Sequence, residues 1–287
     1  MSDRPKIYRN PRQWLQHRRN RPVVTVLRLE GVIAPGRGTP LRPGSLNMNA
    51  LQSMIDQAFK PSRLTAVALQ VNSPGGSPVQ SALISDAIRR RAEEKKVPVL
   101  AFAEDVAASG GYWLLAAGDE VFAHSASVVG SIGVISASFG FQELIQRYGI
   151  ERRIHTAGEK KVMMDPFSPE KEEDVARLHE IQKQIHEQFM DHVKARRGDK
   201  LNRRRYKEMF SGEIFLGAEA QRMGLIDELG DMDSVLRARF GKDLVLKRLT
   251  PRSSPIRRLL GGASAPDLAA QAASEIEART SWGRFGL

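Results

Sequence analysis

Two glycine-rich turns contain the residues whose types and spacing could do chemistry. The segments Asn72-Ser73-Pro74-Gly75-Gly76 and Ala107-Ala108-Ser109-Gly110-Gly111-Tyr112 each lie where an apolar run gives way to a helical pattern. Backbone N–H groups at helix N-termini are unpaired and favour negative charge. Two such turns facing one another could donate N–H groups to a developing oxyanion, as acyl-transfer catalysts do. Either turn alone is also typical of an ordinary type II turn or helix N-cap.

A serine nucleophile at Ser109 needs a base, and the residues leave two kinds open. His124, 15 residues further on, is the nearest histidine. A lysine amine has an ordinary pKa of ~10.4 and must be desolvated toward ~7–8 before it can accept a proton near neutral pH. Lys160 and Lys161 come just after Gly158 and ahead of apolar residues, so one of them could point inward.

Several other kinds of site are excluded by the sequence. The chain has no cysteine, which excludes a disulfide scaffold, a cysteine-based zinc site and a cysteine nucleophile. It contains no HExxH, GxSxG, P-loop or GxGxxG motif, so we expect no metal and no cofactor. His179, His186 and His192 are expected to be ordinary surface or packing residues of a long helix.

Strands and helices alternate along the first half of the chain. The predicted strands are Val23–Leu29, Thr65–Val71, Val97–Ala103, Glu120–Phe122, Ile132–Ser136 and Arg152–Thr156. The predicted helices are Leu46–Phe59, Val79–Lys95, Ser109–Ala117 and Phe139–Tyr148. This alternation predicts an α/β fold with a parallel sheet. Both glycine turns would then lie at the carboxyl ends of strands, where open α/β sheets bind ligands.

The second half of the chain is mainly helical. Ser168-Pro169-Glu170 is a good helix start, with serine at the N-cap and proline at the first position. The helix behind it is predicted to run to about Arg197 and to end at Gly198. Its apolar residues recur every three or four positions, which is typical of a helix that lies across a sheet or a neighbouring subunit.

The charge is concentrated at the two ends of the chain. The net charge is +11, of which residues 1–22 carry +6 and residues 246–287 carry +4. We therefore expect a basic N-terminal tail (1–22), a catalytic domain (23–245) and a basic, partly flexible C-terminal tail (246–287). A nucleic-acid enzyme would place its basic stripe on the folded body, so no nucleic-acid partner is expected.

The location expected from these features is the cytoplasm. No apolar run approaches the ~20 residues that a spanning helix needs, and no signal-peptide core follows the basic start. The basic ends could contact an anionic membrane surface at the inner face of the cell membrane, or remain solvated.

Three motifs in order resemble the signal peptide peptidase A / SohB family of serine peptidases. They are Asn72–Ser77, Asp105–Tyr112 and Gly130–Val134, and the resemblance extends from about Val23 to Gly230. It implies a Clp-protease/crotonase-like fold of repeated ββα units with a largely parallel sheet and a helical C-terminal part. It also implies a Ser–Lys dyad, a variant of the catalytic triad.

The resemblance also implies roles for single residues. Ser109 matches the nucleophile, Lys161, three residues after Gly158, matches the general base, and Ser131 matches a serine that orients the lysine. The implied oxyanion-hole donors are the N–H groups of Gly76 and Gly110. The substrate would be bound along Ser73, Gly75, Gly111 and Gly130. The related Clp protease has its histidine where this chain has Val134, so that triad is absent.

The implied function is an ATP-independent serine endopeptidase that cleaves signal-peptide remnants or other apolar, unfolded segments. In this family each site draws on neighbouring halves or protomers, so we expect a ring-shaped homo-oligomer. The expected contact surfaces are Pro169–Arg197 and Val128–Phe141. One alternative is a crotonase-like acyl-CoA enzyme with the same oxyanion hole, which would leave Ser109 and Lys161 without roles. The other is a non-catalytic scaffold at the membrane, against which the intact dyad argues.

Overall fold

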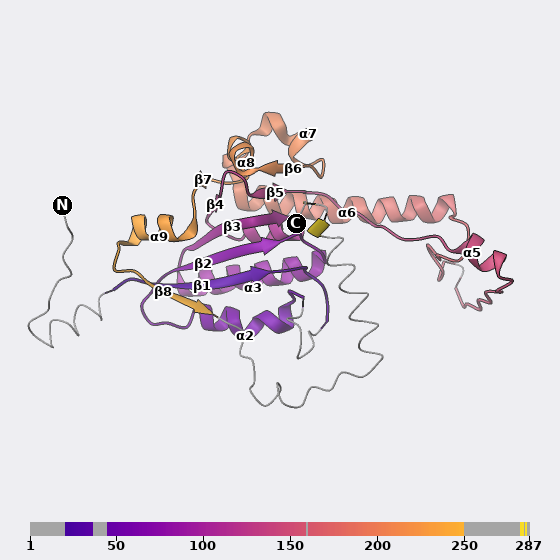
Figure 1. The fold of residues 1–287 in the computed structure, drawn as a ribbon, viewed down its shortest axis with the longest axis horizontal. Helices are drawn as coiled ribbons and strands as arrows, with labels where there is room; N and C mark the ends of the chain where they lie inside the picture. The colour runs from indigo at the N-terminus through magenta and orange to yellow at the C-terminus, as the bar shows by residue number, and fades with distance from the viewer. Residues whose placement is uncertain (1–20, 37–44, 159, 250–281, 284, 286–287) are drawn as a thin grey trace, which may run out of the picture.

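The fold is centred on a largely parallel sheet, seen here in a computed structural model that describes residues 21–36, 45–158, 160–249, 282–283 and 285 (Figure 1). Its strands are β1 (Val23–Glu30), β2 (Leu64–Ser73), β3 (Val99–Ala108), β4 (Glu120–Ala123), β5 (Val128–Gly130), β6 (Ile214–Leu216), β7 (Glu228–Leu229) and β8 (Val245–Leu249). The order is β6-β5-β3-β2-β1-β8, and β4 pairs with β3 and β7. Among these pairings β5–β6 is antiparallel and the others are parallel. The predicted α/β class with a largely parallel sheet is confirmed.

Helices cover both faces of this sheet. The helices of the described chain are α2 (Met48–Ala58), α3 (Pro78–Lys95), α4 (Gly110–Leu115), α5 (Gln142–Arg147), α6 (Glu172–Arg197), α7 (Tyr206–Met209), α8 (Gly217–Met223) and α9 (Met232–Phe240), with 3-10 turns at Gly198–Lys200 and Arg203–Arg205; α5 lies away from the sheet (Figure 1). The larger apolar core lies between one face and α2, α3 and α4, whereas α9 packs on the opposite face (Figure 1).

The central strands are buried on both sides, which explains their continuous apolar runs. Leu27, Leu69 and Ala101 lie side by side in register and belong to the larger core. Their neighbours Val26, Ala68 and Leu100 form the next register row and face α9. Because side chains alternate between the faces of a strand, each run supplies both cores at once.

Strand pairing brings the ends of β2, β3 and β5 together. Ser73 at the end of β2 pairs with Ala107, and Ala108 at the end of β3 pairs with Gly130. The helix after β2 begins at once, because Ser77 accepts a hydrogen bond from the amide of Gln80 and Pro78 occupies the first helical turn. The helix after β3 begins directly at Gly110.

Residues 133–158 and 160–171, called the arm below, extend away from the sheet. Figure 1 shows α5 beyond the N-terminal end of α6, at the side of the molecule. The arm is held together locally: the amide of Phe141 donates to the carbonyl oxygen of Pro166 at 2.6 Å, and Arg152 pairs with Asp165 at 2.9 Å. No residue described between 133 and 188 is buried.

Three sequence predictions in this region are wrong. The segments Ile132–Ser136 and Arg152–Thr156 form no strand, since neither pairs with the sheet. The helix α6 begins at Glu172 with Lys171 at its N-cap, and Ser168 does not cap it. Ser168 instead donates its hydroxyl to the Asp165 carboxylate, in a turn closed by a hydrogen bond from the Ser168 amide to the Asp165 carbonyl oxygen.

The C-terminal boundary of the folded body also differs from the prediction. Strand β8 pairs in parallel with β1 from Val245 to Leu249, so the sheet includes residues 246–249 of the predicted C-terminal tail. Residues 1–20 and 250–281, which make up most of the two predicted tails, lie outside the described residues. In the part of the chain that is described, no helix is both long and apolar enough to cross a membrane.

Candidate active site

Ser109 occupies a strained position between β3 and α4. Its backbone has φ +52° and ψ −124°, which is uncommon for a residue other than glycine and costs about 1–3 kcal/mol. Its amide donates to the carbonyl oxygen of Gly130 at 2.8 Å, and its carbonyl oxygen accepts from Trp113 at 3.1 Å. The half-buried hydroxyl makes no hydrogen bond within the described residues. Backbone bonds therefore hold the residue while its hydroxyl stays free to react.

The two glycine turns touch backbone to backbone. A Cβ added to Gly75 would lie 2.7 Å from both the amide nitrogen of Gly110 and the Cβ of Ser109. A Cβ on Gly111 would lie 2.3 Å from the carbonyl oxygen of Ser73. Gly75 has φ +101°, so both its conformation and its contacts require glycine. The structure thus brings Ser73, Gly75, Gly110 and Gly111 together around Ser109.

The amides of Gly76 and Gly110 are two free donors beside this serine. The nitrogen of Gly76 lies 3.3 Å from the position that a Gly110 Cβ would take. Neither N–H donates a hydrogen bond to any residue in the described part of the chain. Free amides next to a free hydroxyl are the arrangement that stabilises a tetrahedral oxyanion.

Sequence reasoning did not single out Ile33, which holds the first turn in place. Its amide donates to the carbonyl oxygen of Gly75 at 2.8 Å, and its carbonyl oxygen accepts from Ser77 at 2.7 Å. Gly76 packs so closely on Ile33 that an added Cβ would lie 2.0 Å from the Ile33 carbonyl oxygen. The one available signal was the short apolar pair after Gly31, at the end of a predicted strand.

Ser131 lies in the loop that also binds the amide of Ser109. It is 8% exposed and has φ +52°. Its amide donates to the carbonyl oxygen of Glu213 at 2.6 Å, while the preceding residue, Gly130, accepts the hydrogen bond from Ser109. Gly130 has φ +99°, and a Cβ there would meet the ring of Phe215 at 2.9 Å. The nucleophile candidate is thus hydrogen-bonded to the residue directly before Ser131.

Lys161 is not brought to Ser109 within one chain. It is exposed in the arm, and its amide donates to the carbonyl oxygen of Gly158 at 3.2 Å. Just after it, the arm bonds to Asp174 of α6, whereas α4 contacts α6 at Phe189, whose ring stacks on Trp113. These two anchor points are 15 residues apart on α6, or about 22 Å along the helix axis. Among the described residues no hydrogen bond or ion pair joins the Lys161 amine to either serine.

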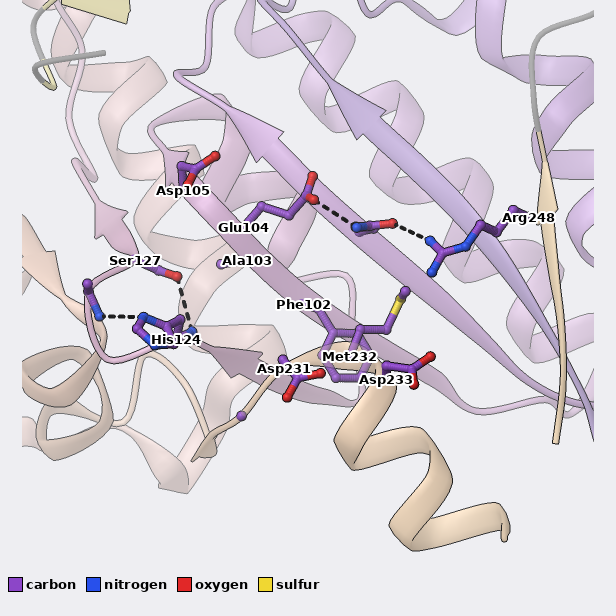
Figure 2. Close-up of a pocket in the computed structure, with 13 residues that line it drawn as sticks. Phe102, Ala103, Glu104, Asp105, His124, Ser127, Asp231, Met232, Asp233 and Arg248 are labelled. Atoms are coloured by element: carbon purple, nitrogen blue, oxygen red, sulfur yellow. Dashed lines mark hydrogen bonds between the residues drawn. The ribbon is translucent and has the colours of Figure 1, made fainter. Parts of the chain in front are cut away.

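His124, the alternative base, is engaged elsewhere. Its Nδ1 accepts a hydrogen bond from the amide of Ala126 at 3.2 Å, in the loop between β4 and β5. The ring lines a pocket of about 400 Å³ over β3 and the start of α9 (Figure 2). No contact between His124 and Ser109 appears among the described residues, so the histidine has no geometry for a catalytic base.

Apart from His124, the same pocket is lined by none of the candidate site residues. Its charged side chains are already paired: Glu104 accepts from Gln70, and Gln70 accepts from Arg248 (Figure 2). Asp233 pairs with Arg237 on α9. No group of three or more His, Cys, Asp or Glu residues that could hold a metal ion occurs in the described part of the chain.

Comparison with known proteins gives one family match. Residues 91–243 match the model of Peptidase family S49. The Na(+)/H(+) antiporter NhaA of Brucella abortus is 46% identical over 275 residues, which cover 92% of this chain and 37% of that protein. The chloroplastic Serine protease SPPA of Arabidopsis thaliana is 27% identical, over 80% of this chain and 34% of that protein. The chain therefore spans little more than a third of the length of these relatives.

A solved structure also matches. A mutant of the 1510-N membrane-bound stomatin-specific protease has a TM-score of 0.48 and 13% sequence identity, and the match covers 81% of this chain and 99% of that one.

Proposed function

Since the chain belongs to peptidase family S49, we propose that it is a serine peptidase with Ser109 as nucleophile and Lys161 as general base. The observation that carries this proposal is the contact between the two glycine turns. It places the free amides of Gly76 and Gly110 beside a serine that is held in a strained backbone conformation.

The reaction follows from these groups. The neutral amine of Lys161 takes the hydroxyl proton of Ser109 while the oxygen attacks the peptide carbonyl carbon. The amides of Gly76 and Gly110 bind the resulting oxyanion. The ammonium then returns its proton to the leaving amine as the C–N bond breaks, and water hydrolyses the acyl-enzyme by the same steps. Ser131 would accept a hydrogen bond from the lysine and orient it. No step needs ATP.

We infer that each site is completed by a second copy of the chain. Large apolar side chains of the arm are exposed, including Ile135 (68%), Phe139 (79%) and Tyr148 (71%). An apolar surface of this kind is typical of a protein interface. A head-to-tail contact that closes into a ring would cover the arm and bring Lys161 to the Ser109 of the neighbouring copy. Contact with that copy would also remove water from the amine, which favours its uncharged form.

The proposed substrates are apolar, unfolded peptide segments such as signal-peptide remnants. Val79 and Leu83, on the first two turns of α3 directly after the Gly76 turn, are 65% and 46% exposed. Apolar side chains beside the candidate site suit apolar residues of a substrate. Cleavage of a peptide library tests this choice: apolar peptides should be cleaved faster than charged ones of equal length, and the reverse order would contradict it.

A fluorophosphonate probe tests the peptidase proposal directly, because only an activated serine reacts with it. The wild-type chain should be labelled, Ser109→Ala should not be, and the control Ser53→Ala, at an exposed position of α2, should be labelled like wild type. Absence of labelling in the assembled wild-type protein would contradict the proposal. A crotonase-like acyl-CoA enzyme would instead bind coenzyme A thioesters without labelling, and a scaffold would do neither.

The proposed location is the cytoplasm, at the inner face of the membrane. Its support is the charge of the sequence, in which residues 1–22 carry +6 and residues 246–287 carry +4. Flotation with anionic liposomes at low salt should carry the protein, and neutral liposomes should not. Equal flotation with anionic and neutral liposomes would contradict the proposed membrane contact.

A second candidate role follows from the relative named as an antiporter. Because 92% of this chain is 46% identical to part of the Na(+)/H(+) antiporter NhaA of Brucella abortus, the chain could work as a peptidase unit beside a membrane cation antiporter. Co-purification in mild detergent from its own cells tests this role. Recovery of an antiporter would support it, and recovery of the chain without one would contradict it.

A further inference from the structure

His186 of α6 contacts the loop that contains Ser131. Its Nε2 lies 3.0 Å from the carbonyl oxygen of Ile132, the residue directly after Ser131. A carbonyl oxygen can only accept, so Nε2 carries the proton and the ring is the donor. Among the described residues and counting from the N-terminal end of α6, this is the first hydrogen bond between the helix and the loop that follows β5.

The loop that His186 contacts is held at three further points. Gly130 accepts from the amide of Ser109, Ser131 donates to Glu213, and the amide of Gly133 donates to the carbonyl oxygen of Ser131 at 3.0 Å. Both Ser131 and Gly130 have positive φ, and such a conformation persists only where surrounding contacts hold it. The Ile132 carbonyl lies at the centre of this tight turn, and His186 is its described hydrogen-bond partner.

We propose that His186 is a positioning residue for the peptidase site: through the Ile132 carbonyl it holds Ser131, and through Gly130 it holds the backbone of Ser109. This role rests on the proposed function, since it needs both serines in the catalytic site. His186 does not itself touch the reacting atoms. It acts on the serine predicted to orient the lysine.

The position of His186 on α6 gives this contact a second consequence. The arm is bonded to the N-terminal part of the same helix through Asp174, and the helix packs on α4 at Phe189, less than one turn after His186. The helix that anchors the arm of Lys161 at its N-terminal end therefore also fixes the loop of Ser131 near its middle. Any shift of α6 on assembly would move both sets of groups together.

Three variants separate this role from simple stability. His186→Leu removes the donor and keeps a side chain of similar bulk, whereas His186→Gln keeps an amide nitrogen that can reach the position of Nε2. The matched control is His179→Leu, the same change at an exposed position two turns earlier on α6. Hydrogen–deuterium exchange of the peptide covering residues 128–136 reports whether the loop is held, and needs no peptidase activity.

We expect faster exchange of residues 128–136 in His186→Leu, and exchange as in wild type in His186→Gln and His179→Leu. With a peptide substrate, His186→Leu should lower kcat by up to about a hundredfold with little change in KM, because a small displacement of a catalytic group suffices for such a loss. His186→Gln should recover most of this activity. Unchanged exchange in His186→Leu would overturn the proposal, whether or not the wild-type chain is a peptidase.

The remaining outcomes are also decisive. Faster exchange together with unchanged kcat, in a wild-type protein that reacts with the fluorophosphonate probe, would overturn the catalytic part of the proposal while the proposed function stands. If His186→Leu fails to fold, His186→Gln still decides: activity as low as that of Ser109→Ala in a folded protein would show that the hydrogen bond is not what matters.

Discussion

At the scale of single residues, the proposed chemistry depends on which of two adjacent lysines supplies the amine. Lys160 and Lys161 are both exposed, and neither contacts Ser109 within one chain. Lys161→Ala should lower kcat by several orders of magnitude, about 10³-fold or more, because the members of a catalytic unit fail together. Lys160→Ala should retain most of the activity. Steady-state kinetics on the assembled proteins measures kcat of both variants. Loss of activity in Lys160→Ala alone would assign the general base to Lys160 instead.

A largely buried histidine makes the stability of the chain depend on pH. Burial lowers the pKa of His192 to about 4, although its ring nitrogen lies 3.2 Å from the carbonyl oxygen of Trp113. The unfolded chain binds this proton at its ordinary pKa of about 6.5, so the unfolded state gains protons first as the pH falls. The contribution to stability is complete above pH 6.5 and is lost as the pH falls toward 4.

Replacing this histidine should therefore flatten the pH dependence of stability. Between pH 7 and pH 5 the free energy of unfolding of the wild-type chain should fall by about 1–2 kcal/mol more than that of His192→Gln, whose amide does not titrate. Urea unfolding at both pH values measures the difference. The control His179→Gln, at an exposed position on α6, should behave like wild type, and an equal fall in all three proteins would contradict the assignment.

At the scale of elements, the turn between β2 and α3 is the part of the candidate site that tolerates substitution least. Gly75→Ala should abolish fluorophosphonate labelling, because the new Cβ would overlap the Ser109 Cβ and the Gly110 amide, each 2.7 Å away. Gly31→Ala is a matched control, since Gly31 has nearly the same φ, +106° against +101°, and no atom within 4 Å of the added Cβ.

The two variants should share the strain of a positive φ but differ in their loss of activity. Both place an alanine at positive φ, which should lower the free energy of unfolding by about 1–2 kcal/mol, and the overlap at Gly75 should add to this loss in Gly75→Ala. Labelling should persist in Gly31→Ala and disappear in Gly75→Ala. Labelling of both variants at the wild-type rate would show that the two glycine turns do not need to touch for the serine to react.

At the scale of the whole molecule, we expect the single chain to be inactive. Ser109 belongs to the sheet body and Lys161 to an arm in which nothing described from 133 to 158 or from 160 to 171 is buried. Mixing inactive Ser109→Ala with inactive Lys161→Ala under conditions of subunit exchange should restore activity at mixed sites that contain both groups. Native mass spectrometry would confirm the exchange, and continued inactivity after it would place both groups in one chain.

The sequence by itself determined the elements whose signals are local. The caps at Ser77 and Pro78, the glycines of the two turns and the continuous apolar runs of β1 to β3 depend on residues close together in the chain. Backbone sterics and side-chain alternation act over that short range, so the parallel sheet and the approach of Ser73 to the Ser109 turn could be predicted.

Only the tertiary structure decided where the arm lies and what holds the loop of Ser131. The segment predicted as a strand at Arg152–Thr156 pairs with no strand, because it belongs to the arm that extends away from the sheet. The contact between His186 and Ile132 joins residues 54 positions apart, and β8 pairs with β1 across the whole domain. Such contacts depend on which surfaces meet once the chain has folded, and no spacing along the sequence encodes them.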